Sequence, residues 1–303
     1  MDKVAILLST YNGSEFLKAQ LDSLLEQDYP NFTIFIRDDY STDSTIQIIE
    51  TFEKQYPEKI NFLKENFRNI GVLKSFTRLL NYAEADIYFF CDQDDIWLPN
   101  KIATMQAQFN NDEPKLVFCD SEIIGNYASY HTFFRRHPLS KKQISRGLFI
   151  GFVPGCMMAF NQKAKIEYLK SNIDVGLHDS KMFLVTYLTG SICFYDKPLM
   201  HYRIHSNNTV GLGNRDKIGI LTKDLIRYVF KNEKYRKIKL REYFEFVKKI
   251  SLKYNSSLVV KKELLNDIQV SELSYFKRKN WYIKHFKPFH KGWFEGFVRI
   301  LCI

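Results

Sequence analysis

The sequence predicts an α/β fold in which a mostly parallel sheet lies between two layers of helices. Short apolar runs alternate with amphipathic helical segments through the first 120 residues. The runs are apolar at nearly every position, as in strands that are buried on both faces. Strands that alternate with helices form parallel βαβ units with right-handed crossovers. The 45% hydrophobic content of the 303 residues is enough for a sizeable core.

The individual elements follow from hydrophobic spacing, with a period of two or continuous apolar character for strands and 3.6 for helices. Strands are predicted at 4–9, 32–36, 60–63, 86–91 and 116–119, and helices at 14–28, 43–56, 71–83 and 100–109. Beyond residue 120, Pro154 and Gly155 interrupt the apolar segment 149–160, so no plain strand or helix is expected there. The later predicted elements are a helix over 177–189 and two strands over 191–195 and 199–202.

Positive charge is concentrated at the C-terminal end of the chain. Residues 214–303 contain 22 Lys+Arg and 9 Asp+Glu, whereas the whole chain has a net charge of +10. Gly211 and Gly213 precede this change in composition. We therefore expect one domain over 1–212 and a basic, aromatic, helical extension over 213–303.

Cysteine usage and hydropathy suggest a cytosolic protein. The five cysteines include no Cys-x-x-Cys pair and mostly lie in apolar runs, as expected of reduced, buried thiols. The N-terminus leads directly into the first strand, so no signal peptide is expected. No apolar stretch approaches the roughly 18 residues of a transmembrane helix, so none is expected.

Polar residues follow three of the predicted strands at the points where they end. These segments are 10–13, 38–43 and 92–95. Ligands of open parallel sheets bind at the carboxyl ends of the strands. We therefore expect the three segments to form one site.

The segment 92–95 brings Asp92, Asp94 and Asp95 into a single short loop. Three carboxylates this close repel one another unless a cation is bound. Mg²⁺ or Mn²⁺, shared with a diphosphate, would relieve the repulsion. The alternative is a solvated turn that leads into the next helix.

The first two segments suggest nucleotide binding. The Asp39 carboxylate could accept hydrogen bonds from a pyrimidine N3–H or from ribose hydroxyls, and Tyr11 could stack on a base. The alternatives are ordinary ones: Ser41 or Asp43 caps the following helix, and the first segment is a strand-to-helix turn.

The ordered motifs resemble those of family 2 glycosyltransferases with the GT-A fold, over about residues 1–210. They are Ser-Thr-Tyr-Asn-Gly at 9–13, Asp-Asp-Tyr-Ser-Thr-Asp at 38–43, Asn-Ile-Gly at 69–71 and Cys-Asp-Gln-Asp-Asp-Ile-Trp at 91–97. The last form resembles the bacterial rhamnosyltransferase-like branch, which builds cell-wall and capsular polysaccharides. The resemblance implies a nucleotide-sugar half at 1–120 and an acceptor half at 121–212.

The resemblance also implies site residues. Tyr11 and Asp39 would hold the base, Asp92 would meet the ribose or sugar, and Asp94 would coordinate the metal. A lysine beside the diphosphate would stabilise the leaving group, although Lys74 could equally be a solvated helix residue. The implied donor-binding set is Thr10, Tyr11, Asn12, Asp39, Asn69, Gly71, Lys74, Asp92 and Gln93.

The catalytic base is expected at Asp179, where the resemblance places a carboxylate at a helix start. One carboxylate must remove the proton of the acceptor hydroxyl as it attacks C1, and attack opposite the diphosphate inverts that centre. The alternative is a carboxylate stabilised by the helix dipole. His205 could be a further metal ligand or a structural histidine.

Four more residues are assigned to the acceptor side or left without a firm role: Trp97, Gly155, His178 and Arg203. Gly155 is expected in a turn near the donor sugar. Arg203 could pair with a phosphate or with an acidic loop. Cys156 has no neighbouring residue that would support a role as nucleophile, and Asp95 has no assigned role.

The extension combines cations with Trp281, Phe286, Trp293 and Phe297. An amphipathic basic and aromatic segment suits an anionic membrane surface. The alternative is a helical cap packed on the core or on another subunit of a homo-oligomer. No nucleic-acid-binding motif is present, so no nucleic-acid partner is expected.

Together these features predict an inverting, metal-dependent glycosyltransferase on the inner face of the bacterial plasma membrane. The favoured donor is dTDP-rhamnose, and the favoured acceptor is a lipid-linked glycan or growing cell-surface polysaccharide. The alternatives are a UDP-hexose or UDP-N-acetylhexosamine donor, and a non-catalytic nucleotide-sugar-binding scaffold.

Overall fold

The computed structural model describes residues 1–65, 68–109, 112–125, 132–134, 153–171 and 177–205. Met1–Ile204 form one compact unit. The predicted extension over 213–303 and the boundary at Gly211 and Gly213 lie outside the described residues. No helix in the described part of the chain is long and apolar enough to cross a membrane.

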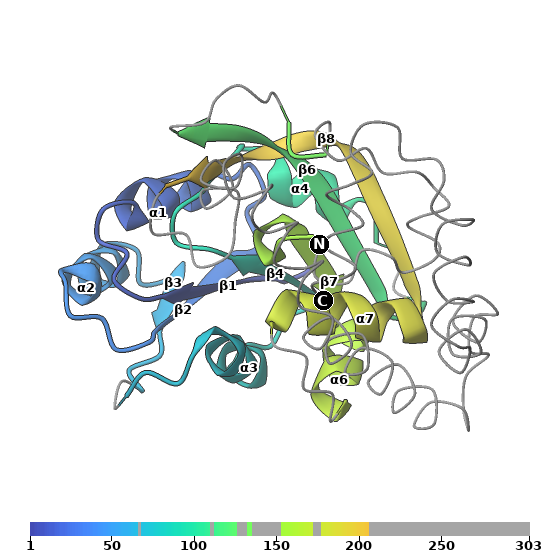
Figure 1. The fold of residues 1–303 in the computed structure, drawn as a ribbon, viewed down its shortest axis with the longest axis horizontal. Helices are drawn as coiled ribbons and strands as arrows, with labels where there is room; N and C mark the ends of the chain where they lie inside the picture. The colour runs from blue at the N-terminus through green and yellow to red at the C-terminus, as the bar shows by residue number, and fades with distance from the viewer. Residues whose placement is uncertain (66–67, 110–111, 126–131, 135–152, 172–176, 206–303) are drawn as a thin grey trace, which may run out of the picture. The chain divides into compact units, whose positions relative to one another are not determined.

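One mixed sheet of eight strands forms the centre of this unit (Figure 1). The strands are β1 (Val4–Thr10), β2 (Phe32–Asp38), β3 (Ile60–Phe62), β4 (Ile87–Cys91), β5 (Ile96–Trp97), β6 (Lys115–Gly125), β7 (Met158–Asn161) and β8 (Ser191–Ile204). Their order is β3-β2-β1-β4-β7-β6-β8-β5. Strands β1 to β4 pair in parallel, as do β6 and β8, whereas β7 is antiparallel to both β4 and β6, and β5 is antiparallel to β8.

Helices cover both faces of the sheet, which confirms the predicted α/β class. The helices are α1 (Leu17–Leu25), α2 (Thr45–Gln55), α3 (Val72–Tyr82), α4 (Lys101–Gln106), the 3₁₀ turn η1 (Gly155–Met157), α6 (Gln162–Lys170) and α7 (His178–Thr189). In Figure 1, α1, α2 and α4 lie on one side of the sheet, and α3, α6 and α7 lie on the other. The N-terminal half matches the predicted alternation closely, with element ends that differ by a few residues.

The second half departs from the prediction at β8. The sequence predicts two strands over 191–195 and 199–202, but β8 is one strand that pairs with β6 along its length. The register between them shifts after Cys119, so that Tyr195 and Pro198 face consecutive residues of β6. A shift of this kind takes Pro198, which has no N–H to donate, into a strand without ending it. The prediction of two strands is therefore wrong.

The apolar segment around Pro154 is a turn followed by a strand. From Val153 onward, where the structure describes it, η1 leads directly into β7. Strand β7 and helix α6 were not predicted separately. Because β7 runs antiparallel between β4 and β6, it brings η1 close to the end of β4.

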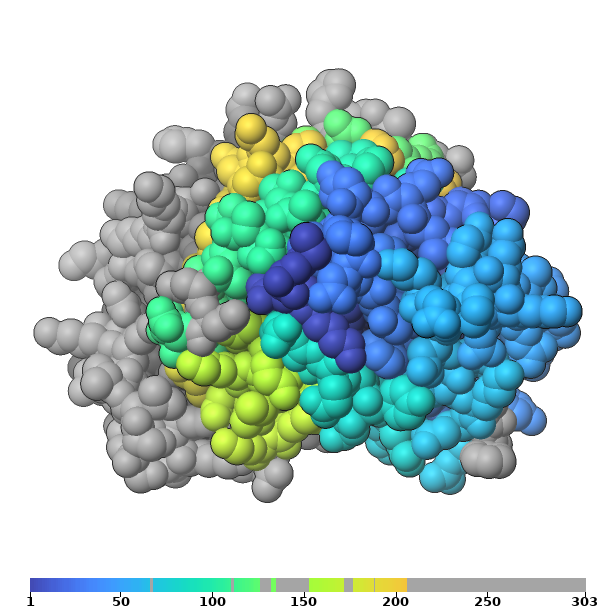
Figure 2. Space-filling model, turned by 180° about the vertical axis from the view of Figure 1, so that it is seen from behind, coloured from blue at the N-terminus to red at the C-terminus, as the bar shows by residue number. Residues whose placement is uncertain are grey.

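The strand register aligns the predicted site edge. Thr10 is paired with Asp38 and Leu8 with Cys91, so β1, β2 and β4 end side by side. The start of β1 lies at the opposite edge, where Figure 2 shows the N-terminal residues at the surface (dark blue). There the Asp2 carboxylate accepts a hydrogen bond from the Gln106 amide at 2.9 Å. The interiors of β1 and β4 are fully buried, and their packing holds the strand ends at the predicted site rigidly in place.

Candidate functional site

The loops that follow β1 and β4 are joined through Gln93. Its Oε1 accepts a hydrogen bond from the Tyr11 N–H at 2.9 Å, and its Nε2 donates to the Tyr11 carbonyl at 3.0 Å. Gly13 leaves space for this amide, since a Cβ on Gly13 would lie 2.2 Å from Gln93 Oε1. The Gln93 amide therefore fixes the two loops against each other. Its predicted contact with a donor stays a prediction.

The loops that follow β1 and β2 are joined by a second set of bonds. The Asn12 side chain accepts a hydrogen bond from the Thr42 N–H at 2.8 Å, and the Asn12 N–H donates to Ser41 Oγ at 2.8 Å. Thr10 is buried and donates its hydroxyl to Asp38 at 2.8 Å. The side chains of Thr10 and Asn12, which were predicted to bind the donor, thus hold the segments after β1 and β2 together.

Asp43 holds the start of α2. Its carboxylate accepts hydrogen bonds from the Thr45 N–H at 3.0 Å and from the Ser14 N–H at 3.1 Å. Burial raises the pKa of Asp43, but the hydrogen bonds from Thr45 and Ser14 outweigh it and lower the pKa to about 2. Asp43 thus ties the start of α2 to the loop after β1, although the N-cap residue of α2 is Ser44, whose side chain makes no capping hydrogen bond.

Asp39 is buried and accepts hydrogen bonds at both oxygens. Its Oδ1 accepts from Arg37 at 2.8 Å and from the Ile70 N–H at 2.8 Å, and its Oδ2 accepts from the Gly71 N–H at 2.8 Å. The side chains of Arg37 and Asp39 are 3% and 5% exposed. Asp39 thus attaches the segment that contains Asn69 to the end of β2.

Near these hydrogen-bonded loops, an aromatic ring and a lysine side chain are exposed to solvent. Tyr11 is 49% exposed, as base stacking would require. Lys74 is exposed on α3, just after Gly71, which has a φ of 82°. Asn69 accepts a hydrogen bond from the Gly71 N–H at 3.1 Å. We refer to residues 10–13, 38–45 and 69–71 as the carboxyl edge.

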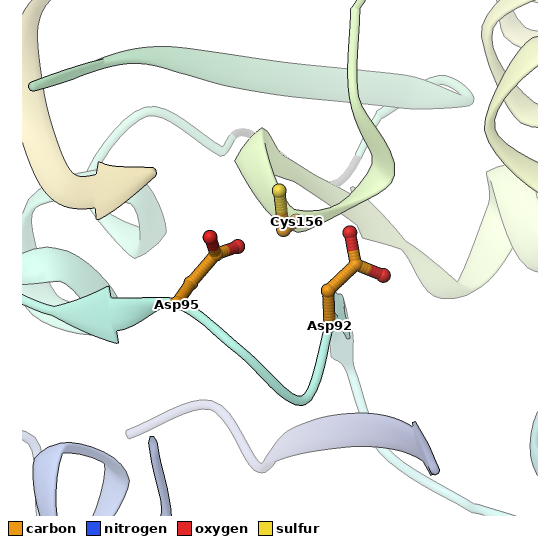
Figure 3. A group of neighbouring side chains, drawn as sticks. All are labelled: Asp92, Asp95 and Cys156. Carbon is orange, nitrogen blue, oxygen red and sulfur yellow. The ribbon is translucent and has the colours of Figure 1, made fainter. Parts of the chain in front are cut away.

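Beside the carboxyl edge lies a second group of side chains: Asp92, Asp95 and Cys156. Asp92 and Asp95 belong to the loop between β4 and β5, and Cys156 belongs to η1 (Figure 3). The side chains point toward one another, and one potential ligand atom of each lies within 4.8 Å of the others. We refer to these three residues as the acidic centre.

Negative charge in the acidic centre is strongly disfavoured. Burial, followed by the nearby Asp94 and Asp179 carboxylates, raises the pKa of Asp92 to about 7. Burial, Asp94 and Asp92 raise the pKa of Asp95 well above its usual range. Burial also raises the pKa of the Cys156 thiol. A bound divalent cation would relieve this accumulation of acidic groups.

Arg203, near the end of β8, binds the acidic loop. Its backbone N–H donates to Asp95 Oδ1 at 3.1 Å, and its Nε donates to the Asp94 carbonyl at 2.9 Å. Of the two partners considered for Arg203, the structure shows the acidic loop. Asp95, which had no predicted role, therefore supplies the side chain that joins this loop to β8, and the Asp94 carbonyl supplies a second bond. Within the described residues, its Oδ2 has no hydrogen-bond partner.

Helix α7, with Asp179 in its first turn, begins beside η1, and the Asp179 carboxylate contributes to the raised pKa of Asp92. The preceding residue, His178, is buried between Phe76, at 3.8 Å between ring centroids, and Phe90, at 4.6 Å. Burial lowers the pKa of His178 to about 4, although Asp179 opposes this effect. A Cβ on Gly155 would lie 2.6 Å from His178 Nε2, so the turn and the helix approach each other closely.

Lys101 is a residue of the site that sequence reasoning missed. It is 0% exposed, and its Nζ donates to the Cys156 carbonyl at 2.6 Å and lies 3.7 Å from the centroid of the Trp97 ring. Trp97 is itself buried against Phe89, at 5.5 Å between ring centroids. Lys101 shares the apolar stripe of α4 with Ile102 and Met105, a pattern that could have indicated a buried lysine. No sequence signal placed Cys156 near the acidic loop.

The remaining predicted metal ligand, His205, follows directly after β8. Its role at a metal stays a prediction. The structure thus brings Asp92, Asp94, Asp95 and Asp179 together with the carboxyl edge.

The chain is also similar to known proteins in sequence and in fold. The family model "Glycosyl transferase family 2" matches residues 5–169. A relative described as dTDP-rhamnosyl transferase RfbG, from Shigella flexneri, is 33% identical over 246 residues, which cover 76% of this chain and 81% of that protein.

Two solved structures have a similar fold. The mannosyltransferase PcManGT from Pyrobaculum calidifontis, in complex with GDP-Man and Mn²⁺, has a TM-score of 0.59 and 14% identity, with 99% of this chain and 84% of that chain covered. S. aureus TarS in complex with UDP-GlcNAc has a TM-score of 0.56 and 16% identity, with 98% and 79% covered. At these identities the likeness concerns the fold.

Proposed function

The chain belongs to glycosyl transferase family 2 and is a glycosyltransferase, and we propose that it transfers L-rhamnose from dTDP-rhamnose with inversion. The proposed acceptor is a lipid-linked glycan or a growing cell-surface polysaccharide. The 33% identity to the dTDP-rhamnosyl transferase of Shigella flexneri supports the donor. The observation that carries the reaction is the close packing of η1, which contains Cys156 of the acidic centre, on His178, the residue before Asp179.

In this proposal Asp179 is the catalytic base. It accepts the proton of the acceptor hydroxyl as that oxygen attacks C1 of the sugar, and the bond from C1 to the diphosphate breaks on the opposite face. Asp179 lies in the first turn of α7 and is close enough to raise the pKa of Asp92. This supports a base on α7 that acts on a donor held after β4, as direct displacement requires.

The nucleotide is proposed to bind along the carboxyl edge. Tyr11 presents an exposed ring for stacking on thymine. The carbonyl of its neighbour Thr10 accepts a hydrogen bond from the N–H of Asp39, which attaches the loop at 69–71. Lys74 supplies an exposed cation on α3 that suits the diphosphate. Thr10, Asn12 and Gln93 act in this proposal by holding the loops that contact the nucleotide.

The residues at the acidic centre fit a divalent cation. Burial and mutual repulsion raise the pKa of Asp92 and Asp95, and Asp95 Oδ2 is a buried oxygen without a partner among the described residues. Asp94 would hold Mg²⁺ or Mn²⁺, with Asp92 beside it and His205 as a further candidate. When bound, the ion would stabilise the charge that develops on the departing diphosphate.

A second donor class is a UDP-hexose or UDP-N-acetylhexosamine, because a neighbour in fold, TarS, was solved with UDP-GlcNAc. Thermal-shift measurements with dTDP-rhamnose, UDP-glucose, UDP-GlcNAc and GDP-mannose separate these donors, since a bound ligand raises Tm. We expect the largest shift with dTDP-rhamnose in the presence of Mn²⁺. A larger shift with a UDP-sugar would replace rhamnose as the proposed sugar.

The base assignment is tested with Asp179→Asn against Asp112→Asn, a matched change at an exposed carboxylate. Transfer to acceptor is measured with donor binding in parallel. We expect Asp179→Asn to abolish transfer but to retain the donor-induced thermal shift, and Asp112→Asn to retain both. Full transfer by Asp179→Asn would show that another residue is the base. Donor binding without transfer by the unaltered protein, on every acceptor tried, would instead support a binding scaffold.

Peripheral association with the inner face of the plasma membrane is proposed from the sequence of the basic extension. Removal of residues 277–303 should weaken binding to vesicles that contain anionic lipid, most clearly at low salt. Unchanged binding after this truncation would refute the membrane role and favour contact with the core or with another subunit.

A further inference from the structure

Two lysines of the described chain are buried in similar ways. Lys101 is 0% exposed, and Lys165 is 4% exposed. Each places its Nζ 2.6 Å from a backbone carbonyl, that of Cys156 for Lys101 and that of Ala83 for Lys165. Each also lies over an aromatic ring, at 3.7 Å from the Trp97 centroid and at 4.7 Å from the Tyr88 centroid. A buried ammonium is retained only where such contacts offset its loss of water.

The two lysines differ in the charges around them. Lys165 has Glu84 at 3.6 Å, whose side chain is 75% exposed. Among the described residues, no carboxylate lies within salt-bridge distance of Lys101. Its positive charge nevertheless favours ionisation of Asp92 and of the Cys156 thiol, so Lys101 lies within the field of the acidic centre.

The bond from Lys101 to Cys156 fixes η1, and η1 contacts both sides of the site. On one side, the Cys156 thiol lies among the Asp92 and Asp95 carboxylates (Figure 3). On the other side, Gly155 packs so closely on His178 that a Cβ would lie 2.6 Å from Nε2. His178 directly precedes Asp179, so the turn lies between the donor side and the proposed base.

We propose that Lys101 is a positioning residue, which sets the separation of Asp92 and Asp179 by holding η1 between them. The inference rests on the proposed function for its catalytic consequence, and on the structure alone for the position of the turn. Lys101 contacts neither substrate in this proposal. Its loss should therefore impair the reaction of bound substrates more than the binding of donor.

The test compares Lys101→Met with Lys165→Met, a matched removal of a buried ammonium away from the acidic centre. Both variants should lower Tm, because both leave a carbonyl without its buried donor. Small misplacements of reacting groups cost large factors in rate, so we expect kcat of Lys101→Met to fall at least about tenfold. The donor KM should stay within about threefold of the unaltered protein, the pattern of an interaction needed only in the transition state. Lys165→Met should keep both constants within about threefold.

A measurement that needs no turnover separates failure of this inference from failure of the proposed function. The alkylation rate of Cys156 by iodoacetamide, followed by peptide mass spectrometry, reports whether η1 has been released. We expect Lys101→Met to accelerate labelling of Cys156 and Lys165→Met to leave it unchanged. If the unaltered protein transfers no sugar, the proposed function fails, and the labelling still decides whether Lys101 positions the turn.

Three results would overturn the inference: equal losses of kcat in the two variants, a change in KM alone, or unchanged labelling of Cys156 in Lys101→Met. If Lys101→Met does not fold, Gly155→Ala displaces the same turn while Lys101 remains. It should also lower kcat with little change in the donor KM. A folded Gly155→Ala protein with kcat within about threefold of the unaltered protein would reject the role of the turn.

Discussion

The carboxyl edge and the acidic centre lie next to each other but are stabilised in different ways. Along the carboxyl edge, polar side chains find hydrogen-bond partners in the neighbouring loops, as Asp39, Asp43 and Asn12 do. In the acidic centre and beside it, Asp95 Oδ2 and both ring nitrogens of His178 have no such partner among the described residues. Satisfied polar groups build a rigid edge, whereas buried polar groups without a partner cost stability and call for a functional explanation.

Substitutions in the two regions should therefore affect different measured properties, sugar transfer in one region and stability in the other. A change in the acidic centre, or at the neighbouring Asp94 that raises the pKa of both its carboxyl groups, should mainly affect transfer. A change along the carboxyl edge should mainly affect folding or loop order.

The largest effect is expected for Asp94→Asn. Loss of the proposed metal ligand should remove several kcal/mol of transition-state stabilisation, or roughly a thousandfold in transfer rate. EDTA should have a similar effect on the unaltered protein, and added Mn²⁺ should reverse it. Asp28→Asn, at an exposed carboxylate, is the control. Full activity in EDTA would exclude a metal-dependent mechanism.

Asp39→Asn should destabilise the fold more than any other change at the carboxyl edge. It would leave Arg37 buried beside a neutral amide, and breaking such a pair costs about 4 kcal/mol. Glu65→Gln removes one partner of an exposed pair, Arg78 and Glu65 at 3.4 Å, and should cost less than about 1 kcal/mol. Urea unfolding measures both. Equal costs would show that burial of the Asp39 pair does not matter.

His178 should make the fold sensitive to acid. Its pKa is about 4 in the folded protein and near 6.5 when unfolded, so the unfolded chain binds more protons between these values. Stability should therefore fall as the pH drops from 6.5 to 4, by about 3 kcal/mol in total. His178→Asn should remove this contribution, and His201→Asn, at a partly exposed site, should not. Parallel urea titrations across this range would contradict the prediction if the slope with pH were the same in all three proteins.

The smallest effect is expected for Gly13→Ala. The new Cβ would displace Gln93 from Tyr11, and the loss of two hydrogen bonds should cost about 2 kcal/mol. Gln93→Ala loses the same bonds, so the double variant should be no less stable than the worse of the single variants. Additive losses in a thermal unfolding cycle would show that Gly13 and Gln93 act independently.

The carboxyl edge could be predicted because its signals are local. Strands β1, β2 and β4 are mostly apolar, and polar residues occupy or directly follow their carboxyl ends. Their parallel register then brings the three strand ends together, as Thr10 opposite Asp38 illustrates. For these elements, apolar pattern and topology point to the same arrangement.

The acidic centre could be predicted only in part, because the position of Cys156 and the role of Asp95 depend on long-range strand pairing. Cys156 reaches Asp92 and Asp95 because β7 inserts antiparallel between β4 and β6, and no local pattern reveals that insertion. Asp95 gained a role only through Arg203, which is brought to it by the long strand β8. The apolar stripe of α4 could have indicated that Lys101 is buried, but its partner, the backbone carbonyl of Cys156, depends on long-range pairing that the sequence does not show.

The Gln93 side chain makes, with one residue, the pair of bonds that a neighbouring strand would make. Its amide offers an N–H donor and a C=O acceptor at the spacing of a peptide group, and both engage the Tyr11 backbone. The hydrogen bonding between β1 and β4 thus continues beyond their last paired residues, Leu8 and Cys91, by one further pair of bonds that a side chain makes. The length of the Gln93 side chain sets the reach of these bonds, so a shorter asparagine at this position would leave the loops after β1 and β4 without them.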